Sequence, residues 1–199
     1  MSKSVVIIGQ TGVGKSSLIN MLCPGAEART SNDTIGCTEV EKKYPCDLGT
    51  ECPCQVHDTI GLEEGSWGFL WAPKAEKRLK TYLKKIKGPC LLVYCIPGRR
   101  GSLKKSHGRN YKKFKSVLGK NVPVVVVVTS LENFEAPLKS WWANNLDILK
   151  TLGIPEYTGH ACITTLTKTD LKILGKEEKL YDKSCDDVKA LITSFLSQI

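Results

Sequence analysis

Apolar runs with the length of buried β-strands alternate along the chain with segments whose apolar residues repeat at helical spacing. The strand-like runs lie near residues 4–8, 39–44, 52–57, 90–96, 122–129 and 160–164. Strands that alternate with helices are typical of a parallel sheet covered by helices. The pattern therefore predicts a three-layer α/β fold with about six mostly parallel strands and helices on both faces.

The segments between these runs carry the apolar stripes of amphipathic helices, which we expect to face the core. The four stripes are Ala75, Leu79, Leu83 and Ile86; Tyr111, Phe114, Val117 and Leu118; Leu138, Trp141, Trp142, Leu146 and Leu149; and Val188, Leu191, Ile192, Phe195 and Leu196. Ser184 and Asp187 have the spacing of a capping box, which predicts that the last helix begins there.

A chain of 199 residues, 41% of them hydrophobic, suits one globular domain, so we expect a single domain over residues 1–199. The first strand-like run begins at Val5, which leaves no room for a signal peptide before it and predicts a cytoplasmic location. The longest uncharged run, residues 122–131, has about half the roughly 20 residues that a membrane helix needs. No transmembrane segment is expected.

The nine cysteines are expected to be reduced, because disulfides are rare in the cytosol. Five residues close in sequence raise the question of zinc: Cys37, Cys46, Cys52, Cys54 and His57. The C-x-C spacing around Pro53 differs from the usual C-x2-C ligand pair, so packing of cysteines within strands is the better interpretation.

The net charge of +9 is concentrated in residues 74–115, the basic sector, which holds 15 basic residues and 1 acidic residue. The rest of the chain has 14 basic and 19 acidic residues. A basic sector on an acidic body indicates an anionic partner such as a lipid surface or RNA. A solvated helix face is the alternative, because no nucleic-acid motif accompanies it.

The first strand runs into GQTGVGKSS, residues 9–17, and then into a helical segment. Gly9, Gly14, Lys15 and Ser16 match the phosphate-loop pattern G-x-x-x-x-G-K-[ST] in the strand–loop–helix context that it requires. Lys15 is expected to reach the β- and γ-phosphates, and the Ser16 hydroxyl to bind Mg²⁺. The residues expected to hold the phosphates are Gly12, Val13, Gly14, Lys15, Ser16 and Ser17. The chain is therefore predicted to bind a nucleoside triphosphate.

The third strand-like run is followed by DTIGL, residues 58–62, which matches the D-x-x-G element of switch GTPases. A phosphate loop, a threonine-bearing loop and D-x-x-G in this order resemble the translation-factor-related P-loop GTPases, on their Era-like and septin-like side. The resemblance covers essentially the whole chain. It implies a Ras-like G domain that binds GTP and GDP with Mg²⁺, in which Asp58 supports magnesium through water and the Gly61 N–H senses the γ-phosphate.

The same resemblance implies a threonine that closes over magnesium and the γ-phosphate, and Thr34 and Thr38 are both candidates. Thr38 is favoured because it directly precedes the expected second strand, whereas Thr34 has a Ras-like distance from Ser16.

Leu62 stands where Ras-like enzymes carry the glutamine that orients the attacking water. An apolar side chain cannot do this. Relatives with a hydrophobic residue at this position often hydrolyse slowly alone and are helped by a partner or by dimerising across the nucleotide face, so the resemblance implies slow hydrolysis and a possible homodimer here. Glu63 or Glu64 is the alternative for positioning water, and the other interpretation makes both exposed loop acids.

LLVYCIPGRR resembles a stretch of the immunity-associated and chloroplast-import-receptor GTPases in which Gly-Arg follows an apolar strand. In some relatives such an arginine faces the partner's nucleotide. Arg99, or Arg100, is therefore a candidate arginine finger in trans, and simple membership of the basic sector is the alternative. The rest of that signature is not reproduced here.

The valine-rich fifth strand leads into Thr129, Ser130 and Glu132, where G domains carry [NT]-K-x-D. The resemblance implies that Glu132 accepts hydrogen bonds from guanine N1–H and the 2-amino group. Ser130 replaces the lysine whose stem packs over the base, which removes stacking worth about 1 kcal/mol. The resemblance also implies that Thr164 and Thr165 lie in the loop whose backbone N–H binds guanine O6.

Three functions stay open at this stage. A slow GTP-hydrolysing switch leads. An ATP-using or base-tolerant P-loop NTPase is suggested by Ser130 and Glu132. A nucleotide-binding scaffold with little hydrolysis would act through the basic sector.

Overall fold

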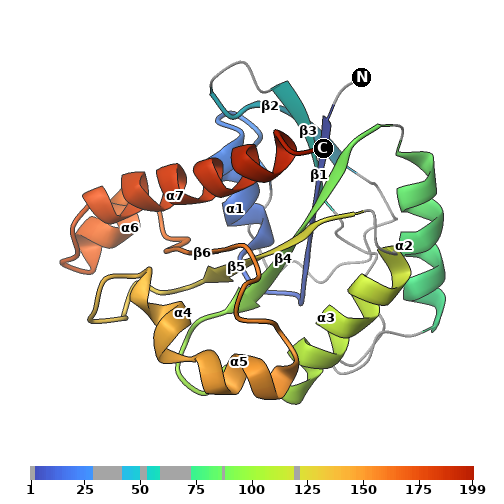
Figure 1. Cartoon of the computed structure of the whole chain (residues 1–199). Coiled ribbons are helices and arrows are strands. Elements are labelled where there is room, and N and C mark those ends of the chain that lie inside the picture. The colour runs from blue at the N-terminus through green and yellow to red at the C-terminus, as the bar shows by residue number, and fades with distance from the viewer. Residues whose placement is uncertain (1–2, 29–41, 50–52, 59–72, 87, 119–121) are drawn as a thin grey trace.

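The computed structural model describes residues 3–28, 42–49, 53–58, 73–86, 88–118 and 122–199. Its six-stranded sheet has the order β2-β3-β1-β4-β5-β6, and only β2 and β3 are antiparallel neighbours (Figure 1). The predicted six-stranded, mostly parallel sheet is confirmed. The strands are β1 (Lys3–Gly9), β2 (Lys42–Asp47), β3 (Pro53–Asp58), β4 (Cys90–Pro97), β5 (Val124–Thr129) and β6 (His160–Cys162).

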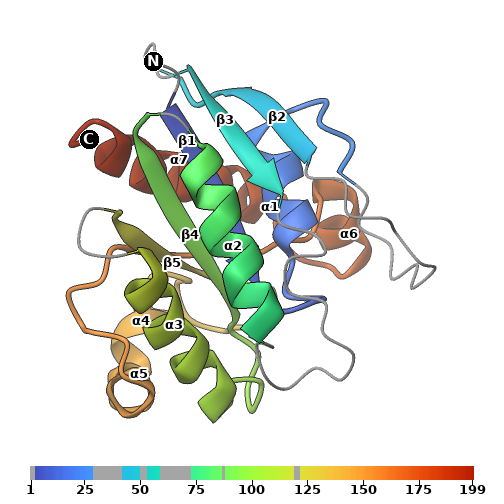
Figure 2. The ribbon, with the colours of Figure 1, turned by 90° about the vertical axis from the view of Figure 1, so that its right-hand side faces the viewer.

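Helices cover both faces of this sheet (Figures 1 and 2). Successive strand residues point to opposite faces, so Val5 and Ile7 enter one core and Val6 and Ile8 enter the other. The first core lies under α1 (Lys15–Leu22) and α7 (Lys179–Leu196), with α6 (Lys168–Ile173) beside α7. The second lies under α2 (Pro73–Lys85), α3 (Lys105–Leu118), α4 (Ser140–Asn144) and α5 (Leu146–Leu152). The predicted three layers are confirmed.

The second strand was predicted too early in the chain. The expected run was 39–44, whereas β2 spans Lys42–Asp47 and residues 39–41 lie outside the described residues. Pro45 falls within β2, opposite Gln55 of β3. Proline is tolerated there because β2 is an edge strand, whose other side needs no ladder hydrogen bonds.

The predicted start of the last helix at Ser184 is wrong. The helix begins at Lys179, and Ser184 is buried within it. Its hydroxyl donates to Leu180 O at 2.7 Å and accepts from Thr164 N–H at 3.2 Å. Ser184 is therefore explained by its tertiary hydrogen bond with Thr164 and not by a position at the start of the helix. The capping box in the structure is Thr167 with Asp170, at the start of α6.

The stripe from Leu138 to Leu149 divides into two short helices, α4 and α5, that meet at Asn145. Asn145 Nδ2 donates to Trp141 O at 2.7 Å. Such local side-chain bonds to the backbone compete with the helical pattern, which explains the break. Trp141 and Trp142 are buried, as their stripe predicts.

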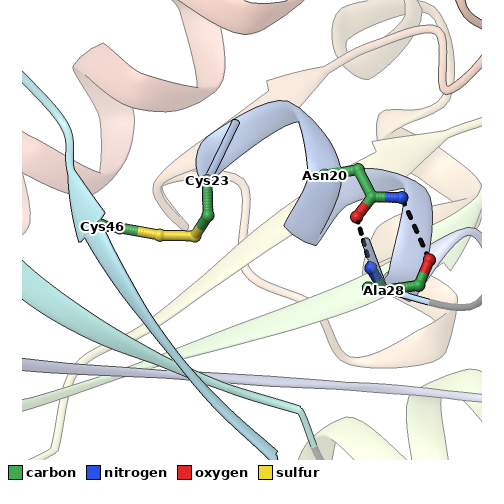
Figure 3. The surroundings of a disulfide bond; sticks show 4 residues. All are labelled: Asn20, Cys23, Ala28 and Cys46. Atoms are coloured by element: carbon green, nitrogen blue, oxygen red, sulfur yellow. Dashed lines mark hydrogen bonds between the residues drawn. A yellow bond between two sulfur atoms is a disulfide. The ribbon is translucent and has the colours of Figure 1, made fainter. Parts of the chain in front are cut away.

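A disulfide joins Cys23, at the C-terminal end of α1, to Cys46 in β2, with their Cα atoms 5.0 Å apart (Figure 3). The prediction of reduced cysteines is therefore wrong for this pair. Asn20 adds a second tie, since its side chain accepts from Ala28 N–H at 2.8 Å and donates to Ala28 O at 3.1 Å. The Asn20 bonds hold Ala28, on the N-terminal side of residues 29–41, and the disulfide holds Cys46, on their C-terminal side.

The sequence also favours cysteine packing over a zinc site and predicts no transmembrane segment. Within the described residues, no cluster of three or more His, Cys, Asp or Glu side chains suits a metal ion, and Cys37 and Cys52 lie outside those residues. None of the helices in the described part of the chain has both the length and the apolar character to cross a bilayer.

Candidate functional site

The loop between β1 and α1 turns back sharply into the helix. Gly12 and Gly14 have φ values of 76° and 89°, in the left-handed region that glycine adopts without steric cost. A side chain at Gly14 would also lie 3.1 Å from Thr165 Cγ2. Gly14 is the N-cap of α1, which has no acidic residue in its first turn. Helix starts of this kind present unpaired N–H groups that attract anions.

Lys15 is the first residue of α1 and is buried against the same loop. Its ammonium donates to Gly9 O and, at 3.2 Å, to Gln10 O. These contacts hold the charge at the loop, where a phosphate oxygen is a stronger acceptor than a carbonyl oxygen. Ser16 and Ser17 follow, half-buried, in the first turn of the helix.

Asp58 ends β3 and is buried beside Ile7 of β1, at the same edge of the sheet as the loop. A serine hydroxyl and a carboxylate are the oxygen ligands that magnesium prefers, so Ser16 and Asp58 fit this ion. The remaining switch candidates, Thr34, Thr38, Gly61, Leu62, Glu63 and Glu64, lie outside the described residues.

Thr129 connects the end of β5 to the phosphate loop. Its fully buried hydroxyl lies 2.7 Å from Val13 O and 3.2 Å from Ile96 O. The next residue, Ser130, has a φ of 61°, so the chain turns sharply where the strand ends. The two predicted parts of the site, near Val13 and near Thr129, are therefore in direct contact.

The loop after β6 lies beside this turn. Ile163 N–H donates to Val128 O at 2.8 Å, and Ile163 O accepts from Leu131 N–H at 3.3 Å. Thr164 is fully buried and its N–H already donates to Ser184 Oγ. Thr165 is half-buried and lies against Gly14, so it is the member of the predicted pair that borders the phosphate loop.

Arg99 and Glu132 form an ion pair, with Arg99 Nη2 donating to Glu132 Oε1 at 3.2 Å. The arginine side chain is 68% exposed and the glutamate side chain is 4% exposed. Glu132 Oε2 is also buried, and it has no hydrogen-bond partner within the described residues. The predicted base-reading carboxylate thus contacts the predicted finger arginine of its own chain. The neighbouring Arg100 is exposed.

The sequence interpretation missed this pair, although a signal was present. Arg99 lies two residues after β4, and Glu132 lies three residues after β5. These strands are parallel neighbours whose ends are in register at Pro97 and Thr129. Loops at the ends of neighbouring parallel strands meet, so opposite charges there are candidates for contact.

Two further contacts around the site were also missed. His57, next to Asp58, shares a hydrogen bond with Tyr82 of α2. Burial, with a smaller contribution from Lys43, lowers the pKa of His57 to about 4, so this link between β3 and α2 is neutral at pH 7. Gln10 Nε2 donates to Ser106 Oγ at 3.2 Å and thereby ties the phosphate loop to the start of α3.

The basic sector forms a surface that includes α2 and α3, which lie side by side (Figure 2). No acidic residue occurs between residues 77 and 131. Exposed basic side chains on this surface include Lys77, Lys80, Lys84, Lys85, Lys104, Lys105, Arg109, Lys112 and Lys115.

Known proteins resemble the chain, and three of them illustrate the likeness. GTPase Der from Parvibaculum lavamentivorans is 32% identical over 133 residues, which are 66% of this chain and 26% of that protein. Era, solved in complex with MgGDPNP and part of 16S ribosomal RNA, is 23% identical with a TM-score of 0.60 over 88% of this chain and 56% of that chain. Toc33 from Arabidopsis thaliana, solved as a dimerization-deficient mutant, is 17% identical with a TM-score of 0.63 over 97% and 85%.

The chain spans about a quarter of the Der protein, and the likeness to Era and Toc33 shows the fold alone. A sequence profile gives the family. The profile of the 50S ribosome-binding GTPases matches residues 4–130, which are more than half of the chain and include the phosphate loop, Asp58, Arg99 and Thr129. The chain therefore belongs to the 50S ribosome-binding GTPase family.

Proposed function

We propose that the chain is a nucleotide-dependent switch that binds GTP and GDP with magnesium and hydrolyses GTP slowly. The observation that carries this proposal is the hydrogen bond from the Thr129 hydroxyl to Val13 O, which brings the predicted base loop into contact with the predicted phosphate loop. Membership of a GTPase family supports guanine as the base.

The roles of the site residues follow from this proposal. Lys15 would bind the β- and γ-phosphates, and the backbone of residues 12–17 would surround the phosphates. Ser16 and Asp58 would hold magnesium, with Thr38 as the expected switch threonine and the Gly61 N–H at the γ-phosphate. The magnesium ion would neutralise charge that develops on the phosphate oxygens.

Slow hydrolysis is proposed because Leu62 cannot orient water. A homodimer across the nucleotide face would then supply the missing activation. The Toc33 structure is that of a dimerization-deficient mutant, and by analogy dimerisation is part of the proposal for this chain.

A base-tolerant P-loop NTPase is the second candidate. The observation that favours it is the Arg99 contact, which occupies one oxygen of the carboxylate that would read the base. A scaffold with little hydrolysis is a third interpretation, since the basic sector presents an extended charged surface.

Titration with GTP, GDP and ATP in the presence of magnesium, followed by turnover at increasing protein concentration, separates these functions. The switch predicts that guanine nucleotides bind at least about tenfold more tightly than ATP, because adenine presents an acceptor where guanine presents the N1–H donor. Turnover per molecule should rise with protein concentration if a dimer activates hydrolysis. Equal affinity for ATP and GTP would exclude guanine selectivity, and constant turnover would exclude the dimer.

The basic sector is proposed to bind an anionic partner, either RNA or a lipid surface. Era was solved with a ribosomal RNA segment, so RNA is one of the two partners to test, beside anionic vesicles. Replacing Lys84, Lys85, Lys104 and Lys105 with glutamate should reduce binding to RNA or to anionic vesicles by at least about a hundredfold at low salt, because each phosphate contact contributes a salt-dependent term. Matched reversal of Lys172, Lys176, Lys179 and Lys183 is the control. Equal loss in both variants would indicate only a general charge effect.

A single domain over residues 1–199 and a cytoplasmic location remain proposals from the sequence.

A further inference from the structure

We propose that Arg99 acts within its own chain as the positioning residue of the base-reading carboxylate, and that it leaves Glu132 one oxygen for the base. This inference rests on the proposed nucleotide site. It assigns to the site a ligand class wider than guanine, namely nucleotides of 6-oxopurines, which include hypoxanthine.

The burial of Glu132 is the first step. A carboxylate whose side chain is 4% exposed loses most of its hydration, and a buried charge is tolerated when a cation and hydrogen bonds compensate it. Arg99 provides this compensation from the solvent side, because its own side chain is 68% exposed. The pair therefore differs from an ordinary surface ion pair, in which both partners keep their water.

The backbone before Arg99 is fixed against the base loop, which is the second step. Gly98 N–H donates to Thr129 O at 2.8 Å, and Trp141 Nε1 donates to Gly98 O at 3.0 Å. Leu131 packs so closely over Gly98 that a Cβ there would lie 2.3 Å from Leu131 Cδ2. These contacts fix the backbone next to Arg99 against the loop that carries Glu132, so the arginine side chain starts from a defined position near the carboxylate.

The two carboxylate oxygens then differ, which is the third step. Oε1 accepts from Arg99, whereas Oε2 is buried and has no hydrogen-bond partner within the described residues. Guanine offers two donors on this edge, N1–H and the 2-amino group. With Arg99 on Oε1, the carboxylate accepts N1–H through Oε2, which the entering base has to uncover because that oxygen is buried, and gains little from the amino group. Hypoxanthine keeps N1–H and lacks the amino group, whereas adenine has an acceptor at N1.

The test measures the dissociation constants of GDP, IDP and ADP, each with magnesium, by calorimetry. For the unaltered chain we expect IDP to bind within about threefold of GDP, and ADP to bind at least about tenfold more weakly, as expected for a lost hydrogen bond to a charged group. Arg99→Ala releases Oε1 for the amino group, so the IDP/GDP ratio of dissociation constants should rise to about ten. Lys139→Ala, which removes an exposed cation at the start of α4, is the control and should leave the ratio unchanged.

The outcomes separate the inference from the proposed function. Failure of the unaltered chain to bind any of the three nucleotides would overturn the proposed function itself. Binding with an IDP/GDP ratio of ten or more in the unaltered chain would overturn only the role of Arg99. The role of Arg99 would also be overturned if Arg99→Ala kept the IDP/GDP ratio and made turnover per molecule independent of protein concentration. An arginine finger in trans requires that result. Should Arg99→Ala fail to fold, the IDP/GDP ratio of the unaltered chain still decides.

Discussion

Replacing Lys15 with methionine is expected to weaken the binding of Mg·GTP by about a hundredfold or more. Lys15 is buried at the phosphate loop, and its ammonium donates to Gly9 O and Gln10 O. In the proposed complex these hydrogens bind the β- and γ-phosphates, and two hydrogen bonds to charged groups contribute about 3 kcal/mol together. Methionine keeps the apolar stem and removes the charge. Calorimetric titration with GTP and GDP measures the loss directly.

The control replaces Lys183, an exposed lysine of α7, with methionine and should keep the affinity of the unaltered chain. Thermal unfolding of both variants without nucleotide is also needed, because Lys15→Met removes two contacts to loop carbonyls. A variant that folds like the control and binds GTP with unchanged affinity would show that the phosphates lie elsewhere.

Features that depend on local spacing could be predicted from the sequence. The strand–turn–helix unit that carries the predicted phosphate loop is one, because a strand, a glycine-bearing turn and a helix start lie within residues 3–22. The fifth strand is another, since five consecutive valines fit a strand buried on both faces. The order of strand ends predicts that Thr129 belongs to the base loop; its hydroxyl lies 2.7 Å from Val13 O, and its role at the base stays a prediction.

Features that depend on contacts between distant segments could not be predicted in this way. Arg99 and Glu132 are 33 residues apart, and their contact depends on the register of β4 and β5. Ser184 has the spacing of a helix cap, yet its hydroxyl lies within α7 and accepts from Thr164 N–H in the loop after β6. In both cases, tertiary packing decides which of several plausible partners a polar side chain takes.

The disulfide also depends on a contact between distant segments, and its removal is the second change from which we expect a large effect. Cys23 and Cys46 pair because the antiparallel edge strand β2 passes the end of α1, and nothing in the spacing of nine cysteines indicates this. Cys46→Ser is expected to lower the free energy of unfolding by about 3 kcal/mol, the chain-entropy value for a closed loop of roughly this length. The two cysteines are 23 positions apart. Urea unfolding with and without a reductant measures the difference.

The control is Cys185→Ser, at a half-buried cysteine of α7 outside the disulfide. Reductant should destabilise the unaltered chain and Cys185→Ser equally, and should leave Cys46→Ser unchanged. If both cysteines react with a thiol reagent in the folded, unreduced protein, the pairing is wrong.

The closed loop contains both candidate switch threonines, Thr34 and Thr38. Because reduction would release one constraint on that segment, GTP affinity measured with and without reductant also tests whether the disulfide restrains the proposed switch.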